Sequence, residues 1–196
     1  MDIKQQLGNT DIYLIDQILK GTYSEGEKLL DAGIGGGRNL HWFAQHNFEL
    51  HGIDAQFERI QFVKELYPHH AKHFLQADLA NLPYPESTFD HIICSAVLHF
   101  ATSEQHFLAM FSELASVLKP KGTLFIRMTS NFGIQTQFRH LKDGVYSLND
   151  QSTRFLLTHS LLKQVIDQHS LQLIEPLKTT NVSDLRCMST LMFEKK

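Results

Sequence analysis

Hydrophobic residues recur along the chain in two alternating patterns. From Ile12 the apolar positions are three and four residues apart, as on one face of a helix, and this pattern ends near Gly21. The segment 90–95 instead holds a continuous apolar run, which is typical of a strand covered on both faces. The same two patterns predict further helices at 39–45, 57–66, 104–118 and 158–168, and strands at 27–31, 48–54, 73–78, 90–95, 123–128, 171–178 and 186–194.

The alternation of strand and helix predicts an α/β fold, a doubly wound and mainly parallel sheet with helices on both faces. The last two strands differ, because only residues 180–185 connect them, too few for a crossover helix. We therefore expect these strands to pair antiparallel or to share an edge hairpin. A chain of 196 residues without an internal repeat or linker predicts a single domain.

Three aspartates stand where predicted strands end. In a doubly wound sheet, ligands bind outside the carboxyl ends of the strands. This rule selects the loops after Asp31, Asp54, Asp78 and Ser95. We expect a binding site formed by these four loops.

The first of these loops, Asp31–Asn39, is rich in glycine and reads DAGIGGGRN. Its glycines allow a tight turn and a close approach of the backbone to a ligand. Neither reading frame has the third glycine of the dinucleotide fingerprint, since Arg38 or Leu40 stands there, and no phosphate-binding GK[ST] motif is present. The Asp31 carboxylate would repel a phosphate, whereas it suits an ammonium group or a sulfonium nucleoside.

The next two aspartates predict a nucleoside. The two carboxylate oxygens of Asp54 match the vicinal diol of a ribose, a contact that nicotinamide enzymes also use. Asp78 is more discriminating, because it can accept from the exocyclic amine of adenine while the amide of Leu79 donates to the ring. Ala55 and Gln56 would flank the base.

These segments together resemble the class I S-adenosylmethionine-dependent methyltransferases. The resemblance extends from about Glu27 to Lys196, and its motifs are LLDAGIGGG, HGID, QAD, LPYPESTFDHIICSAVLHF and LKPKGTLFI. The fourth motif is typical of the small-molecule branch, which includes ubiquinone-biosynthesis enzymes, and the GGGRN ending is similar to tellurite-resistance methyltransferases. The chain departs from the family at Ile34 and Gly36, where Cys, Thr or Ser is common, and both residues are sterically acceptable there.

The resemblance implies a Rossmann-like sheet of seven strands with the last one reversed. In that sheet Cys94 and Cys187 lie on strands that are not neighbours, so no disulfide is expected. The resemblance also implies a division of the domain 1–196 into a helical cover (1–26), a cofactor-binding half (27–128), and a substrate segment with a C-terminal hairpin (129–196). The implied cofactor contacts are Asp31, Gly33, Ile34 and Gly35 around the methionine part, Asp54 at the ribose, Asp78 and Leu79 at adenine with Ala55 flanking the base, and Ser95 beneath the sulfonium.

Catalysis and acceptor recognition are less constrained by the sequence. His99 lies just past the fourth strand and is the candidate general base, with a structural role as the alternative. Aromatic residues and arginines outside the alternating pattern would suit a small organic acceptor. The candidate acceptor contacts are Tyr13, Phe132, Arg139 and Tyr146.

Composition and charge indicate which substrates and which cellular compartment are expected. The formal charge of −3 and the absence of a Pro-Pro-aromatic motif after the fourth strand disfavour a nucleic-acid substrate. No apolar run is long enough for a membrane span, the N-terminus has no signal-peptide pattern, and the two cysteines fit a reducing compartment, so we expect a cytoplasmic protein. The 12 histidines follow no metal-binding motif, and no metal site is predicted.

The sequence therefore predicts a methyltransferase that uses S-adenosyl-L-methionine and a small-molecule acceptor. Two alternatives remain open at this stage. One is an NAD(P)-dependent oxidoreductase, which Arg38 and Asp78 disfavour, and the other is a non-catalytic protein that binds S-adenosylmethionine. The oligomeric state and the atom methylated, O, N or S, are left undetermined.

Overall fold

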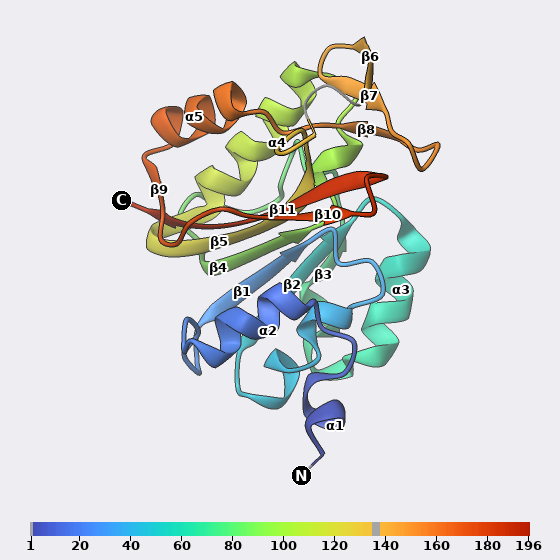
Figure 1. The fold of residues 1–196 in the computed structure, drawn as a ribbon. Helices are drawn as coiled ribbons and strands as arrows, with labels where there is room; N and C mark the ends of the chain where they lie inside the picture. The colour runs from blue at the N-terminus through green and yellow to red at the C-terminus, as the bar shows by residue number, and fades with distance from the viewer. Residues whose placement is uncertain (1, 135–137) are drawn as a thin grey trace.

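A computed structural model of the chain describes residues 2–134 and 138–196. Its centre is a twisted sheet with the strand order β10-β11-β5-β4-β1-β2-β3 (Figure 1). Neighbours from β3 to β5 pair in parallel, whereas β11 pairs antiparallel with β5 and with β10. The strands are β1 Lys28–Ala32, β2 Glu49–Asp54, β3 Phe74–Gln76, β4 Phe89–Ser95, β5 Leu118–Ser130, β9 Leu171–Leu173, β10 Lys178–Val182 and β11 Arg186–Lys195.

This topology confirms the doubly wound α/β fold and the antiparallel pairing of the last two strands. The path crosses seven strands, as the resemblance implies, and β9 adds a short eighth strand that pairs with the C-terminal end of β11. The predicted strand 171–178 is therefore too long: β9 covers only its beginning, and β10 extends into the segment 180–185 that was expected to be a connection. Cys94 in β4 and Cys187 in β11 are both free and buried, and β5 lies between their strands.

Helices cover both faces of the sheet. In Figure 1, α2 (Ile12–Leu19) and α3 (Phe57–Leu66) lie below it, and α4 (Glu104–Val117) and α5 (His159–Gln168) lie above it. The apolar face of each helix decides this arrangement: Leu14 of α2 and Val63 of α3 are fully buried in the lower core, and Phe107 of α4 is fully buried in the upper core.

Several local features were not predicted. The segment expected to be one helix at 39–45 is two 3-10 turns, η1 Arg38–Leu40 and η2 Phe43–Gln45, joined by a two-residue turn. A short helix α1 (Ile3–Leu7) precedes α2, and the region after β5 forms a small antiparallel sheet of β6 (Arg139–Lys142), β7 (Val145–Ser147) and β8 (Thr153–Phe155). Further 3-10 turns, η3 (Pro68–His73) and η4 (Leu98–Phe100), precede β3 and follow β4.

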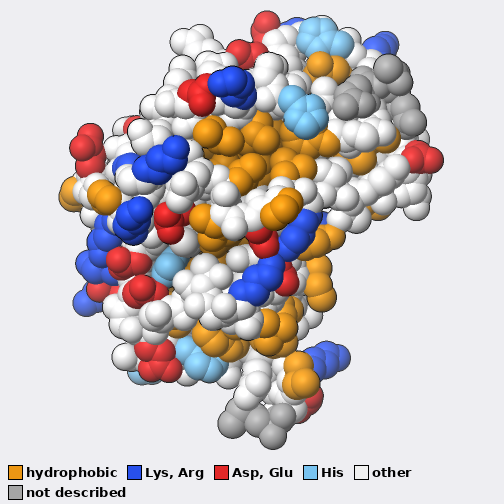
Figure 2. Space-filling view, turned by 60° about the vertical axis from the view of Figure 1, so that its left-hand side comes forward, with side chains coloured by type: hydrophobic (Ala, Val, Ile, Leu, Met, Phe, Trp, Pro, Cys, Tyr) orange, Lys and Arg blue, Asp and Glu red, His pale blue; other side chains and the backbone are white. Residues whose placement is uncertain are grey.

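The upper core contains a narrow apolar crevice between α4, α5 and the sheet. On the outside of the molecule, Figure 2 shows hydrophobic side chains gathered on the upper part of the face that is turned to the viewer. The crevice is too narrow to admit a water molecule, so it belongs to the packing of the core. Among the described residues, no helix is long and apolar enough to cross a membrane.

Candidate functional site

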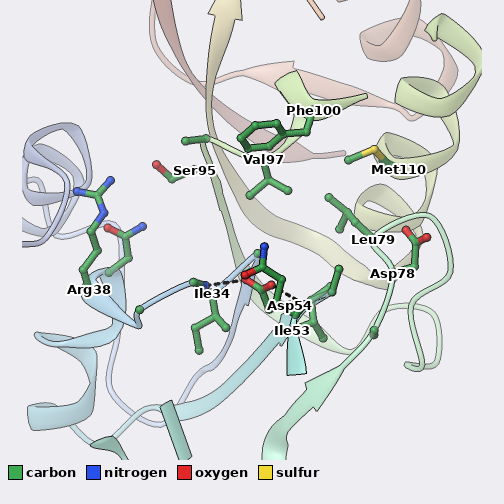
Figure 3. A pocket seen from close by; sticks show the side chains of 18 of the residues that line it. Ile34, Arg38, Ile53, Asp54, Asp78, Leu79, Ser95, Val97, Phe100 and Met110 are labelled. Atoms are coloured by element: carbon green, nitrogen blue, oxygen red, sulfur yellow. Dashed lines mark hydrogen bonds between the residues drawn. The ribbon is translucent and has the colours of Figure 1, made fainter. Parts of the chain in front are cut away.

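A cavity of about 640 Å³ opens at the carboxyl ends of β1, β2 and β4 (Figure 3). This volume is in the range of pockets that hold small organic ligands. The strands supply its floor, the loops after them its walls, and Phe100 and Met110 its far side. The lining residues are Gly33–Gly36, Arg38, Asn39, Ile53–Gln56, Ala77–Leu79, Ser95–Val97, Phe100, His106 and Met110.

Asp54 holds the two nearest loops in place. Its Oδ2 accepts a hydrogen bond from the amide of Gly35 at 2.9 Å, and its Oδ1 accepts one from the amide of Gln56 at 2.9 Å. A carboxylate oxygen can accept more than one hydrogen bond, so Asp54 keeps acceptor capacity toward the cavity. Gly35 has a positive φ of 53°, and a Cβ built on it would meet no atom within 4 Å. The backbone is thus open to a close approach at this point.

Asp78 and Leu79 line the same cavity, which brings the third predicted loop to the site. Asp78 lies two residues beyond β3, and its Oδ1 accepts a hydrogen bond from the amide of Ala80 at 2.9 Å. This Asx-type turn fixes the loop that carries both residues. Leu79 is nearly buried and adds an apolar wall.

Asp31 lies beneath the site and is not among the residues that line the cavity. Its side chain is 2% exposed, and burial raises the pKa of the carboxyl group to about 7. The nearby Arg38 opposes this rise, and the charge of Asp54 adds to it. Among the predicted cofactor residues, Gly33, Ile34, Gly35, Asp54, Ala55, Asp78, Leu79 and Ser95 do line the cavity.

Sequence reasoning missed an ionic cluster at one edge of the cavity. Asp11, 3% exposed, lies between Arg38 and Arg127, and its Oδ2 is 3.3 Å and 3.2 Å from their guanidinium nitrogens. The hydroxyl of Ser95 donates to the same oxygen at 3.4 Å, while Oδ1 caps α2 through the amide of Tyr13 at 3.0 Å. The sequence signals only the helix cap, because the arginines lie 27 and 116 residues away.

His99 lies in η4. Its neighbours Val97 and Phe100 line the cavity, whereas His99 itself does not. Its side chain is buried, and Nδ1 has no hydrogen-bond partner among the described residues. Burial lowers the pKa of the imidazole to about 4, and the positive charges of Arg154, Arg186 and Arg127 lower it further in that order of effect. His99 is therefore neutral at pH 7 and a weak base.

The predicted acceptor contacts do not gather at the cavity. Tyr13 lies beside the Asp11 cluster, where its ring stands 5.4 Å from the Arg127 guanidinium carbon and its hydroxyl pairs with Thr180. Phe132 is buried against the ring of His159. Arg139 is exposed on β6, and Tyr146 on β7 packs edge-on against His140. None of the four lines the cavity as described.

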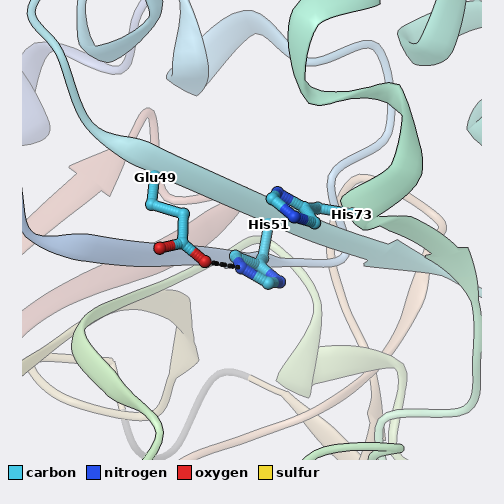
Figure 4. A group of neighbouring side chains, drawn as sticks. All are labelled: Glu49, His51 and His73. Carbon is cyan, nitrogen blue, oxygen red and sulfur yellow. Dashed lines mark hydrogen bonds and ion pairs between the residues drawn. The ribbon is translucent and has the colours of Figure 1, made fainter.

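Within the described residues, one group has the composition of a metal site: Glu49, His51 and His73 (Figure 4). A carboxylate oxygen of Glu49 lies 3.0 Å from Nε2 of His51. The rings of His51 and His73 stack with centroids 4.2 Å apart and planes 3° apart. An imidazole binds a metal through a lone pair in its ring plane, and stacked parallel rings direct these lone pairs into two separate planes. In this arrangement the two rings cannot share one ion.

The neutral state of His99 predicts an acid-sensitive fold. Because its pKa falls from an ordinary value of 6.5 to about 4 on folding, the unfolded chain binds the proton more readily in this interval. Stability is retained above pH 6.5 and lost as the pH falls toward 4, by about 1.4 kcal/mol per pH unit for this one group. We expect the His99→Gln variant to lose less stability between pH 7 and pH 5 than the wild type in urea unfolding. The exposed His69→Gln should follow the wild type, and parallel curves for all three proteins would contradict the prediction.

Comparison with known proteins identifies the domain. Residues 30–126 match the methyltransferase domain family, and this range holds the glycine loop, Asp54, Asp78 and Ser95. The chain contains a class I S-adenosylmethionine-dependent methyltransferase domain. The cofactor of this domain is S-adenosylmethionine.

Two sequence relatives and two solved structures show the range of similar proteins. The chain is 29% identical over 147 residues to a fatty-acid O-methyltransferase of Mycolicibacterium smegmatis, covering 72% of this chain and 52% of that protein. It is 29% identical over 101 residues to a demethylmenaquinone methyltransferase of Tropheryma whipplei, covering 52% of this chain and 41% of that protein. The chain thus spans about half the length of the curated relatives it matches.

The structural similarity covers nearly the whole methyltransferase chain. A methyltransferase from Methanosarcina mazei superimposes with a TM-score of 0.74 at 16% identity, covering 91% of this chain and 96% of that one. A 1,6-didemethyltoxoflavin-N1-methyltransferase of Burkholderia thailandensis, solved with S-adenosylhomocysteine, gives a TM-score of 0.71 at 15% identity. The match covers 100% of this chain and 81% of that one. At these identities the superpositions show a shared fold.

The cavity of this methyltransferase domain fits the cofactor. Open backbone at Gly35 leaves space for the methionine part, and the carboxylate of Asp54 has acceptor capacity for a ribose diol. Ile53 and Leu79 provide apolar surface for an adenine ring beside the carboxylate of Asp78. The donor set and the shape therefore agree with a sulfonium nucleoside.

Proposed function

We propose that this chain is a cytoplasmic enzyme that transfers a methyl group from S-adenosylmethionine to an O, N or S atom of a small organic acceptor. The observation that carries the proposal is the single cavity that joins the glycine loop, Asp54 and Asp78 at the carboxyl ends of the strands. The names of two relatives, a fatty-acid and a demethylmenaquinone methyltransferase, support a small-molecule acceptor.

In this proposal each cofactor group has its own residues. Asp54 accepts hydrogen bonds from the ribose hydroxyls, and Asp78 accepts from the adenine amine while Ala55 and Leu79 flank the ring. Gly33, Ile34, Gly35 and Ser95 surround the methionine part, with Asp31 acting from beneath. Residues 1–26 cover the cofactor-binding half 27–128, and 129–196 contribute the substrate segment and the C-terminal hairpin.

When bound, the cofactor supplies an activated methyl group with a good leaving group. The work of the chain is then to orient the acceptor, hold it at close distance and exclude water. Val97, Phe100 and Met110 form the apolar side of the cavity and serve these purposes. Tyr13, Phe132, Arg139 and Tyr146 remain candidate acceptor contacts that closure of the site would have to bring nearer.

His99 remains the candidate general base for an acceptor that must lose a proton. Its neutral form is available at pH 7, although a pKa of about 4 makes it a weak base. The His99→Gln enzyme tests the role through the pH dependence of kcat. If kcat is lowered by the same factor at all pH values, His99 has a structural role and is not the general base.

Calorimetric titration separates this function from the two alternatives. We expect binding of S-adenosylmethionine and S-adenosylhomocysteine and none of NAD. Tight NAD binding without a response to the sulfonium would support an oxidoreductase, which the family match already disfavours. Cofactor binding without turnover of any acceptor would support a non-catalytic protein.

The ribose contact is tested by Asp54→Ala. We expect the affinity for S-adenosylhomocysteine to fall by about 1.5–3 kcal/mol, the usual contribution of hydrogen bonds to a charged group. The matched control is Asp167→Ala, which removes an exposed carboxylate of α5 that pairs only with Lys163 among the described residues. An Asp54→Ala protein that is folded by circular dichroism and binds with unchanged affinity would contradict this role.

A further inference from the structure

We propose that the methyl acceptor is an organic acid with a flat apolar body, and that Arg154 and Phe100 recognise its carboxylate and its body. This inference rests on the proposed function and adds the substrate class. It concerns the side of the cavity opposite the predicted adenosine contacts.

Phe100 offers an exposed ring at this side. Its side chain lines the cavity although the residue is 58% exposed, and Figure 3 shows its ring across the cavity from Asp54. A large aromatic residue left this open at a pocket is available for contact with a ligand. Flat apolar surface is the group that such a ring binds best.

Arg154 of β8 places a positive charge over this ring. Its guanidinium carbon lies 4.9 Å from the centroid of Phe100. The one hydrogen bond of its side chain goes to the carbonyl of the neighbouring Thr153, at 2.7 Å, and no carboxylate of the described residues pairs with it. A guanidinium held on an aromatic ring with free donors is suited to bind a carboxylate through two parallel hydrogen bonds.

Two other arginines, Arg186 and Arg127, act together with Arg154 on the pKa of His99. Arg127 and Arg38 share the single carboxylate of Asp11, and the Nε of Arg127 is buried without a partner in the described part of the chain. Arg186 forms an ion pair with Asp150, whose Oδ2 lies 2.8 Å from a guanidinium nitrogen. Arg154, in contrast, has no acidic partner among the described residues, so an anionic ligand would compensate its charge.

Charge is also distributed unequally around the cavity. Asp54 and Asp78 line the end predicted for the nucleoside, whereas Arg154 lies over Phe100 at the opposite side, outside the residues that line the cavity. Buried His99, beside Phe100, contributes no charge at neutral pH and so does not offset an anion. An acidic acceptor matches this distribution better than a cationic one does.

The experiment measures binding to the full chain saturated with S-adenosylhomocysteine. The probes are matched pairs of an acid and its neutral amide: 4-hydroxybenzoate with 4-hydroxybenzamide, 2-naphthoate with 2-naphthamide, and octanoate with octanamide. We expect at least one flat acid to bind ten times more tightly than its amide or better, and Arg154→Gln to abolish that preference. Arg154→Lys should retain part of it, because the charge remains and the planar fork is lost.

Separate controls distinguish the possible failures. Arg59→Gln removes an exposed arginine of α3 in the opposite layer and should leave the preference unchanged. The affinity of Arg154→Gln for S-adenosylhomocysteine should equal that of the wild type; a tenfold loss would mean that Arg154 binds the cofactor instead and would overturn the inference. Binding of no acid, equal binding of acids and amides, or an unchanged preference in Arg154→Gln would each overturn it as well. Failure of the wild type to bind S-adenosylhomocysteine at all would instead reject the proposed function.

Discussion

Replacing Asp11 by alanine is expected to lower the free energy of unfolding by about 3 kcal/mol. The change removes a carboxylate that is 3% exposed and leaves Arg38 and Arg127 without their shared acid. Breaking a fully buried pair costs about 3–5 kcal/mol, and loss of a helix cap adds about 1 kcal/mol. The arginine side chains are 47% and 23% exposed, so solvent screening reduces the total. Urea unfolding followed by circular dichroism measures the change.

Asp2→Ala is the matched control for this experiment. Asp2 caps α1 through the amide of Lys4, at 3.0 Å, in the same way that Asp11 caps α2 through Tyr13. Asp2 is exposed and has no arginine beside it among the described residues, so its loss should cost less than about 1 kcal/mol. Equal losses for the two variants would show that the cap, and not the arginine cluster, is the source of the effect.

Gly33→Ala is expected to destabilise the protein by about 2–5 kcal/mol and to close part of the cavity. Gly33 has a φ of +85°, and a Cβ built there would lie 2.3 Å from a methyl carbon of Val97. The left-handed conformation costs a residue with a side chain about 1–2 kcal/mol, and overpacking adds about 1–3 kcal/mol. Thermal unfolding measures the loss, and titration with S-adenosylhomocysteine measures the effect on the site.

Gly21→Ala isolates the backbone contribution to this loss. Gly21 has a similar φ of +71°, and a Cβ at this position meets nothing within 4 Å. We expect it to lose only the 1–2 kcal/mol of the conformational penalty and to keep full affinity. If Gly33→Ala were no worse than Gly21→Ala, the close contact between the glycine loop and Val97 would not constrain the site.

The two ends of the site differ in how the chain forms them. The proposed nucleoside end is built from loops at strand ends, where Asp54 bonds its own loop and the glycine loop and Asp78 bonds its own loop. The proposed acceptor end is built from η4, β5 and β8, which meet only in the folded chain. Variation of the acceptor end alone would change the substrate while the cofactor contacts stay the same.

Local patterns predicted most of the main sheet because burial follows sequence periodicity. The run at 90–95 became β4, and the apolar spacing from Ile12 became α2. The small sheet β6 to β8 escaped prediction because its short strands carry little periodic signal, and β6 is exposed along its whole length. The segment 39–45 became 3-10 turns instead of a helix because Gly37, with a φ of +72°, and the close packing of Tyr67 against it set the start of the turn.

The sequence by itself determined that the loops proposed to bind the cofactor lie together. Parallel strands bring their carboxyl ends to one edge, so any polar residue that follows such a strand is close to the others in space. By this local rule Asp54, Asp78 and Ser95 come together at one cavity. Only the tertiary structure decided that Asp31 is buried beneath the cavity and that Asp11 joins Arg38 to Arg127 at its edge. These arrangements depend on contacts between residues far apart in the chain, which no spacing along the sequence encodes.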